Sequence, residues 1–128
     1  MKDNKRVLLV DDEVEFVETL AERLRTRDLA VYVANSGEEA LEAVDERTYD
    51  AILLDLAMPG MTGLEALEKI RQIRPEAQVI VLTGRATVKD GVKAMKLGAL
   101  DLLEKPVDIT ELVLRIETAA TEKTRLTA

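Results

Sequence analysis

Histidine, cysteine and tryptophan are all missing from the 128 residues of this chain. Without thiolates or imidazoles, the chain cannot build the usual zinc site, and it has neither a cysteine nucleophile nor the histidine of a Ser-His-Asp triad. A disulfide framework is excluded as well. Any chemistry must therefore use carboxylates, hydroxyl groups, lysine amines and the backbone.

Aromatic residues and long apolar runs are also scarce. Only Phe16, Tyr32 and Tyr49 are aromatic, so a core formed by the 47% of hydrophobic residues must rest on Leu, Val, Ile and Ala. The N-terminal run Val7–Val10 ends at two aspartates, which excludes a signal peptide, and no other run is long enough to span a membrane. The sequence predicts one soluble, cytoplasmic domain with no membrane partner.

Acidic residues outnumber basic ones, with 25 Asp and Glu against 18 Lys and Arg, which gives a formal net charge of -7. Sequence-independent binding to nucleic acid needs clustered Lys and Arg to neutralise phosphates, so the domain is not expected to bind nucleic acid directly. A divalent cation or a basic partner surface fits this charge better.

Short apolar runs alternate with helix-period segments along the whole chain. Four of the five runs lack polar alternation, which is typical of strands buried on both faces of a parallel sheet. We therefore expect one α/β domain built from five βα units. The apolar runs are Val7–Val10, Ala30–Ala34, Ala51–Leu54, Val79–Leu82 and Leu100–Leu103.

Polar side chains follow four of these runs. Ligands of open parallel sheets bind beyond the carboxyl ends of the strands. Three carboxylates meeting there would repel one another, which either raises the pKa of at least one of them or requires a cation. Mg²⁺ suits such a site because it prefers oxygen ligands. A lysine and a hydroxyl beside them suit phosphoryl oxygens, so the set predicts an aspartate that receives a phosphoryl group. The residues are Asp11 and Asp12, Asp55, Thr83, and Lys105.

Most of these residues, taken alone, also have a simpler interpretation. Asp11 or Asp12 can cap the helix that follows, Thr83 can be a turn residue, and Lys105 can be a solvated surface lysine. These alternatives are weakened by the occurrence of all the residues at strand ends.

The ordered set resembles the receiver domain of two-component response regulators. It consists of Asp11-Asp12-Glu13, Asp55 with Met58-Pro59 and Gly63, Thr83-Gly84, Gly98-Ala99 and Lys105-Pro106. The resemblance implies a flavodoxin-like (βα)5 fold, with a five-stranded parallel sheet of order 2-1-3-4-5 flanked by five helices. It assigns residues 5–120 to the receiver domain and leaves 121–128 as a C-terminal tail or the start of a linker.

The resemblance also implies a role for each residue of the set. Asp55 becomes the phosphoacceptor, and Thr83 and Lys105 bind phosphoryl oxygens. Mg²⁺ or Mn²⁺ is held directly by Asp12 and Asp55, by Asp11 mainly through water, and by the backbone carbonyl of Ala57. The donor is a sensor histidine kinase or a histidine phosphotransfer protein, and the domain is a regulatory module that catalyses only its own phosphorylation and dephosphorylation.

One position departs from the family pattern. Receivers usually carry an aromatic residue two or three positions before the Lys-Pro pair, and here Leu102 takes that place. Thr83 and Leu102 are then the switch residues, and we expect a weaker conformational response because leucine offers less contact area and no hydroxyl.

A row of lysines marks a candidate partner surface. On the helix predicted after Thr83-Gly84, an inward apolar stripe of Val88, Val92 and Met95 would leave Lys89, Lys93 and Lys96 on one outer flank, where lysines are often merely solvated. By resemblance, the fourth helix, fifth strand and fifth helix form an interaction face for an output domain, a partner protein or a second copy after phosphorylation.

Other families with related folds fit less well. A haloacid-dehalogenase-type phosphatase also uses an aspartate nucleophile with Mg²⁺, but it needs a second Asp where this chain has Ala57. A flavodoxin-like redox protein needs a Ser/Thr/Gly-rich phosphate loop in place of the acidic residues after the first strand, and a dinucleotide fold needs a G-x-G-x-x-G motif that is missing.

Overall fold

The computed structural model describes residues 4–84 and 88–127, in which five strands alternate with five helices. Each predicted apolar run corresponds to one strand, with its ends within one or two residues of the observed bounds, although Leu100 lies just before β5. The elements are β1 (Lys5–Val10), α1 (Val14–Arg25), β2 (Leu29–Ala34), α2 (Gly37–Glu46), β3 (Ala51–Asp55), α3 (Gly63–Ile73), β4 (Val79–Thr83), α4 (Val88–Lys96), β5 (Asp101–Glu104) and α5 (Ile109–Thr127).

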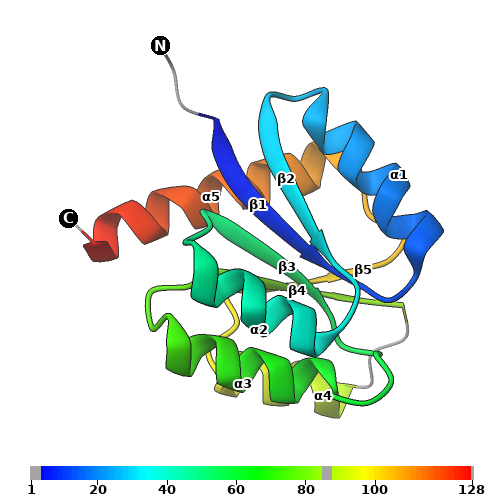
Figure 1. Cartoon of the computed structure of the whole chain (residues 1–128), viewed down its shortest axis with the longest axis vertical. Helices are drawn as coiled ribbons and strands as arrows, with labels where there is room; N and C mark the ends of the chain where they lie inside the picture. The colour runs from blue at the N-terminus through cyan, green and yellow to red at the C-terminus, as the bar shows by residue number, and fades with distance from the viewer. Residues whose placement is uncertain (1–3, 85–87, 128) are drawn as a thin grey trace.

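All strand pairs are parallel, and the strand order is β2-β1-β3-β4-β5. Helices α1 and α5 cover one face of the sheet, and α2, α3 and α4 cover the other (Figure 1). The predicted fold class and strand order are confirmed. The order reverses at β1 and β3, so the residues that follow these two strands lie side by side.

Alternate residues of each central strand are buried against different helices. Along β1, Val7 and Leu9 pack in the cluster with α1 and α5, whereas Leu8 and Val10 pack in the cluster with α2 and α3. All four are at most 1% exposed. A slip of one residue would exchange the two sets, so burial on both faces fixes the register that places the strand ends together.

Helix α4 faces the sheet with different residues from those predicted. Gly91 and Ala94 are buried, whereas Val92 and Met95 are 46% and 47% exposed. A Cβ at Gly91 would lie 3.0 Å from Cδ2 of Leu102, so the absence of a side chain lets the helix approach β5 closely. The expected inward stripe is therefore wrong for Val92 and Met95, and the side chain of Val88 lies outside the described part.

Helix α5 continues to Thr127, so residues 121–127 are helical. Near this end, Lys123 Nζ lies 3.7 Å from Asp50 Oδ1, beside the start of β3. Within the described residues, no helix combines the length and the apolar character needed to cross a lipid bilayer.

Candidate functional site

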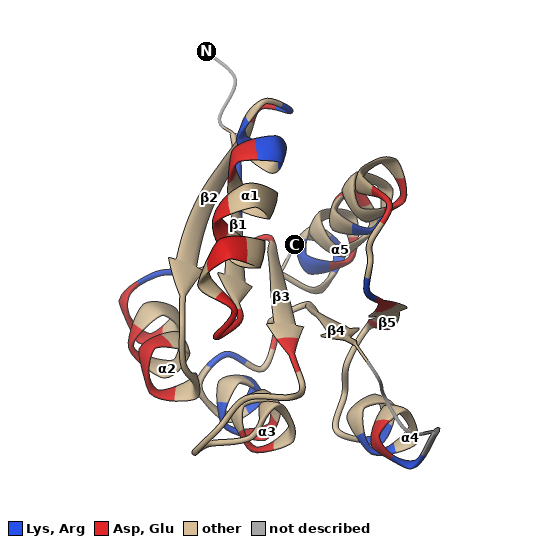
Figure 2. Ribbon diagram, turned by 90° about the vertical axis from the view of Figure 1, so that its right-hand side faces the viewer, with Lys and Arg blue, Asp and Glu red and all other residues tan. Residues whose placement is uncertain are grey.

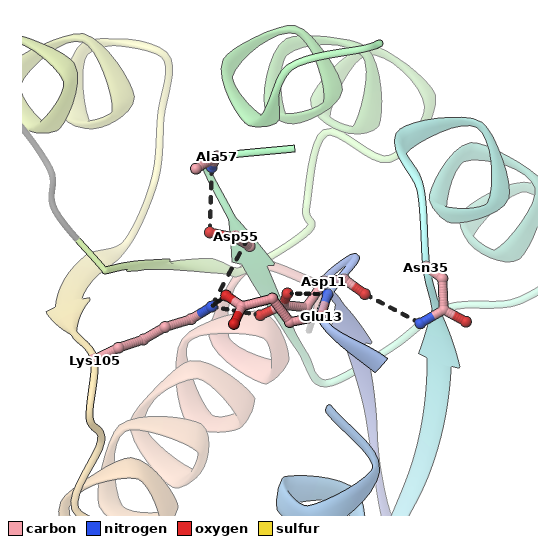
Figure 3. A network of polar contacts seen from close by, with 6 residues as sticks. All are labelled: Asp11, Glu13, Asn35, Asp55, Ala57 and Lys105. Carbon is pink, nitrogen blue, oxygen red and sulfur yellow. Dashed lines mark hydrogen bonds and ion pairs between the residues drawn. The ribbon is translucent and has the colours of Figure 1, made fainter. Parts of the chain in front are cut away.

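The predicted site residues come together at the carboxyl end of the sheet. Asp11 follows β1, Asp55 ends β3, Thr83 ends β4, and Lys105 follows β5. Asp11, Asp55 and Thr83 are only 2–3% exposed, although each carries a polar side chain. Figure 3 shows Asp11, Asp55 and Lys105 pointing toward one another from their separate strand ends.

Lys105 is the cation of this pocket. Its ammonium donates to Asp11 Oδ2 at 2.7 Å and to Glu13 Oε1 at 3.0 Å, and it lies 3.9 Å from Asp55 Oδ2 (Figure 3). Only 11% of the lysine side chain is exposed. The simpler interpretation of Lys105 as a solvated surface lysine is therefore wrong.

Two further residues, Glu13 and Phe16, contact Lys105, and the sequence did not predict these contacts. Glu13 is the N-cap residue of α1, but its side chain makes no capping hydrogen bond and reaches Lys105 instead. The Lys105 ammonium also lies over the ring of Phe16, at 4.3 Å from the ring centroid. Both residues lie at the start of α1, 92 and 89 positions before Lys105, and no local pattern indicates such contacts.

Backbone amides hold the two buried carboxylates in place. Asp11 Oδ1 accepts from the amide of Glu13 at 2.8 Å, and Asp55 Oδ1 accepts from the amide of Ala57 at 3.2 Å. The side-chain amide of Asn35 donates to the backbone carbonyl of Asp11 at 3.1 Å (Figure 3). The capping alternative is wrong for Asp11, because the N-cap of α1 is Glu13 and Asp11 accepts from the amide of that residue instead of capping the helix.

Gly63 fixes the loop that follows Asp55. A Cβ at this position would lie 2.4 Å from Cα of Leu56 and 2.5 Å from the carbonyl oxygen of Asp55, so only glycine fits without moving the backbone. Thr62 begins α3 in a capping box with Glu65. The start of α3 therefore rests directly on the backbone that carries Asp55.

The environment of Asp55 opposes its ionisation. Burial, followed by the negative charge of Asp11, raises the pKa of Asp55 to about 6, although the Ala57 amide and Lys105 act in the other direction. Burial disfavours the charged form of Lys105, but its hydrogen bonds to Asp11 and Glu13 outweigh that effect, and its pKa is raised. Burial and, after it, neighbouring negative charge thus oppose the ionisation of Asp55.

The donor set fits a divalent cation that prefers oxygen ligands. Carboxylate oxygens of Asp11, Asp12 and Asp55 all lie within 4.8 Å of one another. Such a cation would relieve the repulsion that raises the pKa of Asp55. The site can therefore hold Mg²⁺ through its carboxylates, and the carbonyl of Ala57 stays a predicted ligand.

Thr83 contributes a hydroxyl group to the same edge of the sheet. Its Oγ1 is buried and makes no hydrogen bond within the described residues. Thr83 lines a hollow beside the acidic pocket, together with Leu56, Ala57, Thr62, Leu64, Gly84 and Asp90. A buried hydroxyl without a hydrogen bond is costly, and an oxygen-rich ligand in this hollow would satisfy it.

The predicted partner surface lies next to this hollow. Lys89, Lys93 and Lys96 are all exposed on α4, as expected, and basic residues are visible on this helix in Figure 2. Leu102 is half-buried on β5 and faces Gly91 of the same helix. The side chain at the predicted switch position therefore contacts the helix that carries the lysines.

Comparison with known proteins identifies the family. Residues 7–117 match the model of the response regulator receiver domain. The chain is 38% identical over 117 residues to the transcriptional regulatory protein ZraR of Escherichia coli strain K12, an alignment that covers 91% of this chain and 26% of ZraR. The chain thus spans about a quarter of that relative's length.

Solved structures agree with this match. A CheY-like receiver domain protein from Methanospirillum hungatei JF-1 has a TM-score of 0.91 and 29% identity, with 95% of this chain and 98% of that chain covered. A response regulator from Burkholderia pseudomallei, solved with a phosphorylated aspartic acid, a calcium ion and citrate, has a TM-score of 0.84 and 32% identity, with 98% and 74% covered. With its acidic pocket at the end of a 2-1-3-4-5 sheet, this chain belongs to the response regulator receiver domain family of two-component systems.

Proposed function

We propose that this receiver domain accepts a phosphoryl group on Asp55 in a reaction that requires Mg²⁺ or Mn²⁺. The observation that carries the proposal is the placement of the Asp55 carboxylate. It is buried near a lysine ammonium and forms, with Asp11 and Asp12, a cluster able to hold a cation. Beside it lies the Thr83 hydroxyl, which has no hydrogen-bond partner among the described residues. A phosphoryl group on Asp55 would supply oxygens for both Lys105 and Thr83.

The residues act mainly by position and charge, as phosphoryl transfer requires. A carboxylate oxygen of Asp55 attacks phosphorus, the bond from phosphorus to the donor breaks, and the donor leaves with the electron pair. Lys105 and Thr83 would hold phosphoryl oxygens. Asp12, Asp55 and the carbonyl of Ala57 would hold the cation directly, and Asp11 would hold it mainly through water. When bound, Mg²⁺ neutralises charge on the transferring group.

The donor belongs outside this sequence, because the chain contains no histidine that could carry a phosphoryl group. We assign this role to a sensor histidine kinase or a histidine phosphotransfer protein in the cytoplasm. We assign residues 5–120 to a regulatory domain rather than to an enzyme acting on another substrate, and 121–128 to a tail or the start of a linker. The naming of ZraR as a transcriptional regulator supports an output in gene control.

Phosphorylation is expected to depend on the carboxylate cluster. With acetyl phosphate and Mg²⁺, intact mass spectrometry should show one added phosphoryl group, and EDTA should prevent it. Asp12→Asn should slow the addition by about tenfold or more, because the cation loses a charged ligand. Glu15→Gln, which removes an exposed acid from the nearby first turn of α1, is the matched control. Equal rates with Mg²⁺ and with EDTA would exclude the metal requirement.

The output is proposed to pass through Thr83 and Leu102 to α4. When the Thr83 hydroxyl moves to a phosphoryl oxygen, Leu102 can follow, and Leu102 touches α4 where Gly91 leaves no side chain between them. The exposed lysines of α4 would then present a changed surface to an acidic partner, an output domain or a second copy of the chain.

Phosphorylation should shift the amide NMR resonances between Lys89 and Lys105, and by less than in a Leu102→Tyr variant, because tyrosine has more contact area. A variant with Lys89, Lys93 and Lys96 all changed to Glu should keep the phosphoryl adduct but lose binding to the output partner. Shifts as large in the parent as in Leu102→Tyr would contradict the proposed weak switch at Leu102. Partner binding unaffected by the three charge reversals would contradict the proposed partner surface on α4.

A further inference from the structure

The ammonium of Lys105 contacts three carboxylates and one aromatic ring within the described residues. Asp11 and Glu13 accept its hydrogen bonds, Asp55 lies 3.9 Å away, and the ring of Phe16 lies beneath it at 4.3 Å. The face of an aromatic ring attracts a cation electrostatically, and more strongly where water is excluded. With 11% of its side chain exposed, Lys105 is largely excluded from water.

The contact with Phe16 differs from the other contacts because binding of a metal or a phosphoryl group does not disrupt it. A cation bound to the acidic cluster would compete with Lys105 for Asp11, and a phosphoryl group would cover Asp55. Glu13 is 65% exposed, so solvent and salt weaken its attraction. The ring carries no charge and binds no metal, so it keeps its attraction when the pocket fills.

The position of Phe16 in the chain supports a specific role. It is the only phenylalanine in a sequence whose core is otherwise almost entirely aliphatic. The other two aromatic residues, Tyr32 and Tyr49, contact each other edge to face at 5.6 Å. Phe16 stands three residues after Glu13, so the start of α1 presents an acid and an aromatic face to the same lysine.

We propose that Phe16 is a positioning residue, whose ring holds the Lys105 ammonium at the mouth of the pocket while a phosphoryl group is transferred to Asp55. The inference rests on the proposed function. Without the ring, the flexible lysine side chain would spend less time beside the transferring group. The phosphorus to Asp55 bond would still form as the bond to the donor breaks, but more slowly.

Substitution of Phe16 tests the inference. Phe16→Leu keeps apolar bulk and removes the ring, whereas Phe16→Tyr and Phe16→Trp keep an aromatic face. With acetyl phosphate and Mg²⁺, we expect the phosphorylation rate to fall about three- to tenfold in Phe16→Leu and to stay close to the parent rate in the two aromatic variants. If the substitutions only destabilised α1, the rate would not depend on whether residue 16 is aromatic. Melting curves of the parent and the three variants measure any loss of stability.

A second measurement reports the contact without phosphorylation. In protein with ¹³C-labelled lysine, the ε-methylene resonances of Lys105 should be displaced by the ring current of Phe16 and should return to ordinary values in Phe16→Leu. An unchanged rate in Phe16→Leu, or a loss that Tyr and Trp do not restore, would overturn the positioning role while leaving the proposed function intact. A parent protein that takes no phosphoryl group would overturn both.

Discussion

Replacing Asp55 with asparagine is expected to abolish the phosphoryl adduct that the parent chain forms with acetyl phosphate and Mg²⁺. An asparagine amide keeps nearly the same shape, but it carries no charge and does not attack phosphorus as a carboxylate does. Asp11 cannot easily replace it, because Asp11 is paired with Lys105 at 2.7 Å and is fixed by the Glu13 amide. Intact mass spectrometry would show the parent with one adduct and the variant with none.

The control for this experiment is Asp45→Asn, which removes an exposed aspartate on α2 while leaving the pocket unchanged. The control should be phosphorylated like the parent. If Asp55→Asn gained the same adduct as the parent, the phosphoryl group would sit on another residue, and the proposed role of Asp55 would have to be withdrawn.

In metal-free protein, the contribution of Asp55 to the free energy of unfolding is expected to fall as pH rises from about 4 to about 6. The pKa of Asp55 is about 6 in the folded state against an ordinary value of 3.8, so the folded state binds more protons than the unfolded state in this range. Stability then decreases as pH rises. Over the whole interval the loss amounts to about 2–3 kcal/mol.

The comparison of the parent with Asp55→Asn isolates this effect, because asparagine does not titrate. Denaturant unfolding should show Asp55→Asn about 2 kcal/mol more stable than the parent at neutral pH, with the difference vanishing toward pH 4. Mg²⁺ should reduce the difference, since a bound cation stabilises the ionised carboxylate. Parallel pH profiles for the two proteins would show that Asp55 ionises in the fold without penalty.

The sequence was sufficient to predict the elements and the acidic edge of the sheet. Apolar runs buried on both faces identified the strands, and parallel strands deliver their following residues to one edge. This reasoning placed Asp11, Asp55, Thr83 and Lys105 together. The strand order itself came from the family resemblance, because no local pattern states which strands are neighbours.

Contacts that depend on side-chain reach were not predictable. Glu13 was expected only as part of the acidic motif, and Phe16 was noted only as one of few aromatic residues. Their contacts with Lys105 depend on how α1 is placed relative to the end of β5, which no local pattern indicates. The prediction of which residues of α4 face the sheet was wrong for a different reason. Apolar periodicity favours Val92 and Met95, but the structure uses the small volumes of Gly91 and Ala94 to bring the helix close to β5.

The Thr83 hydroxyl, which makes no hydrogen bond within residues 4–84 and 88–127, has a consequence for engineering and for selection. Leaving a buried hydroxyl without a hydrogen bond costs about 1–3 kcal/mol, so a search for thermostable variants would favour valine, which has nearly the same shape. Such a variant would discard a group that the phosphorylated state is proposed to need. Stability and signalling therefore make opposite demands on this position, and stabilising substitutions for this domain are better sought on surfaces far from the pocket.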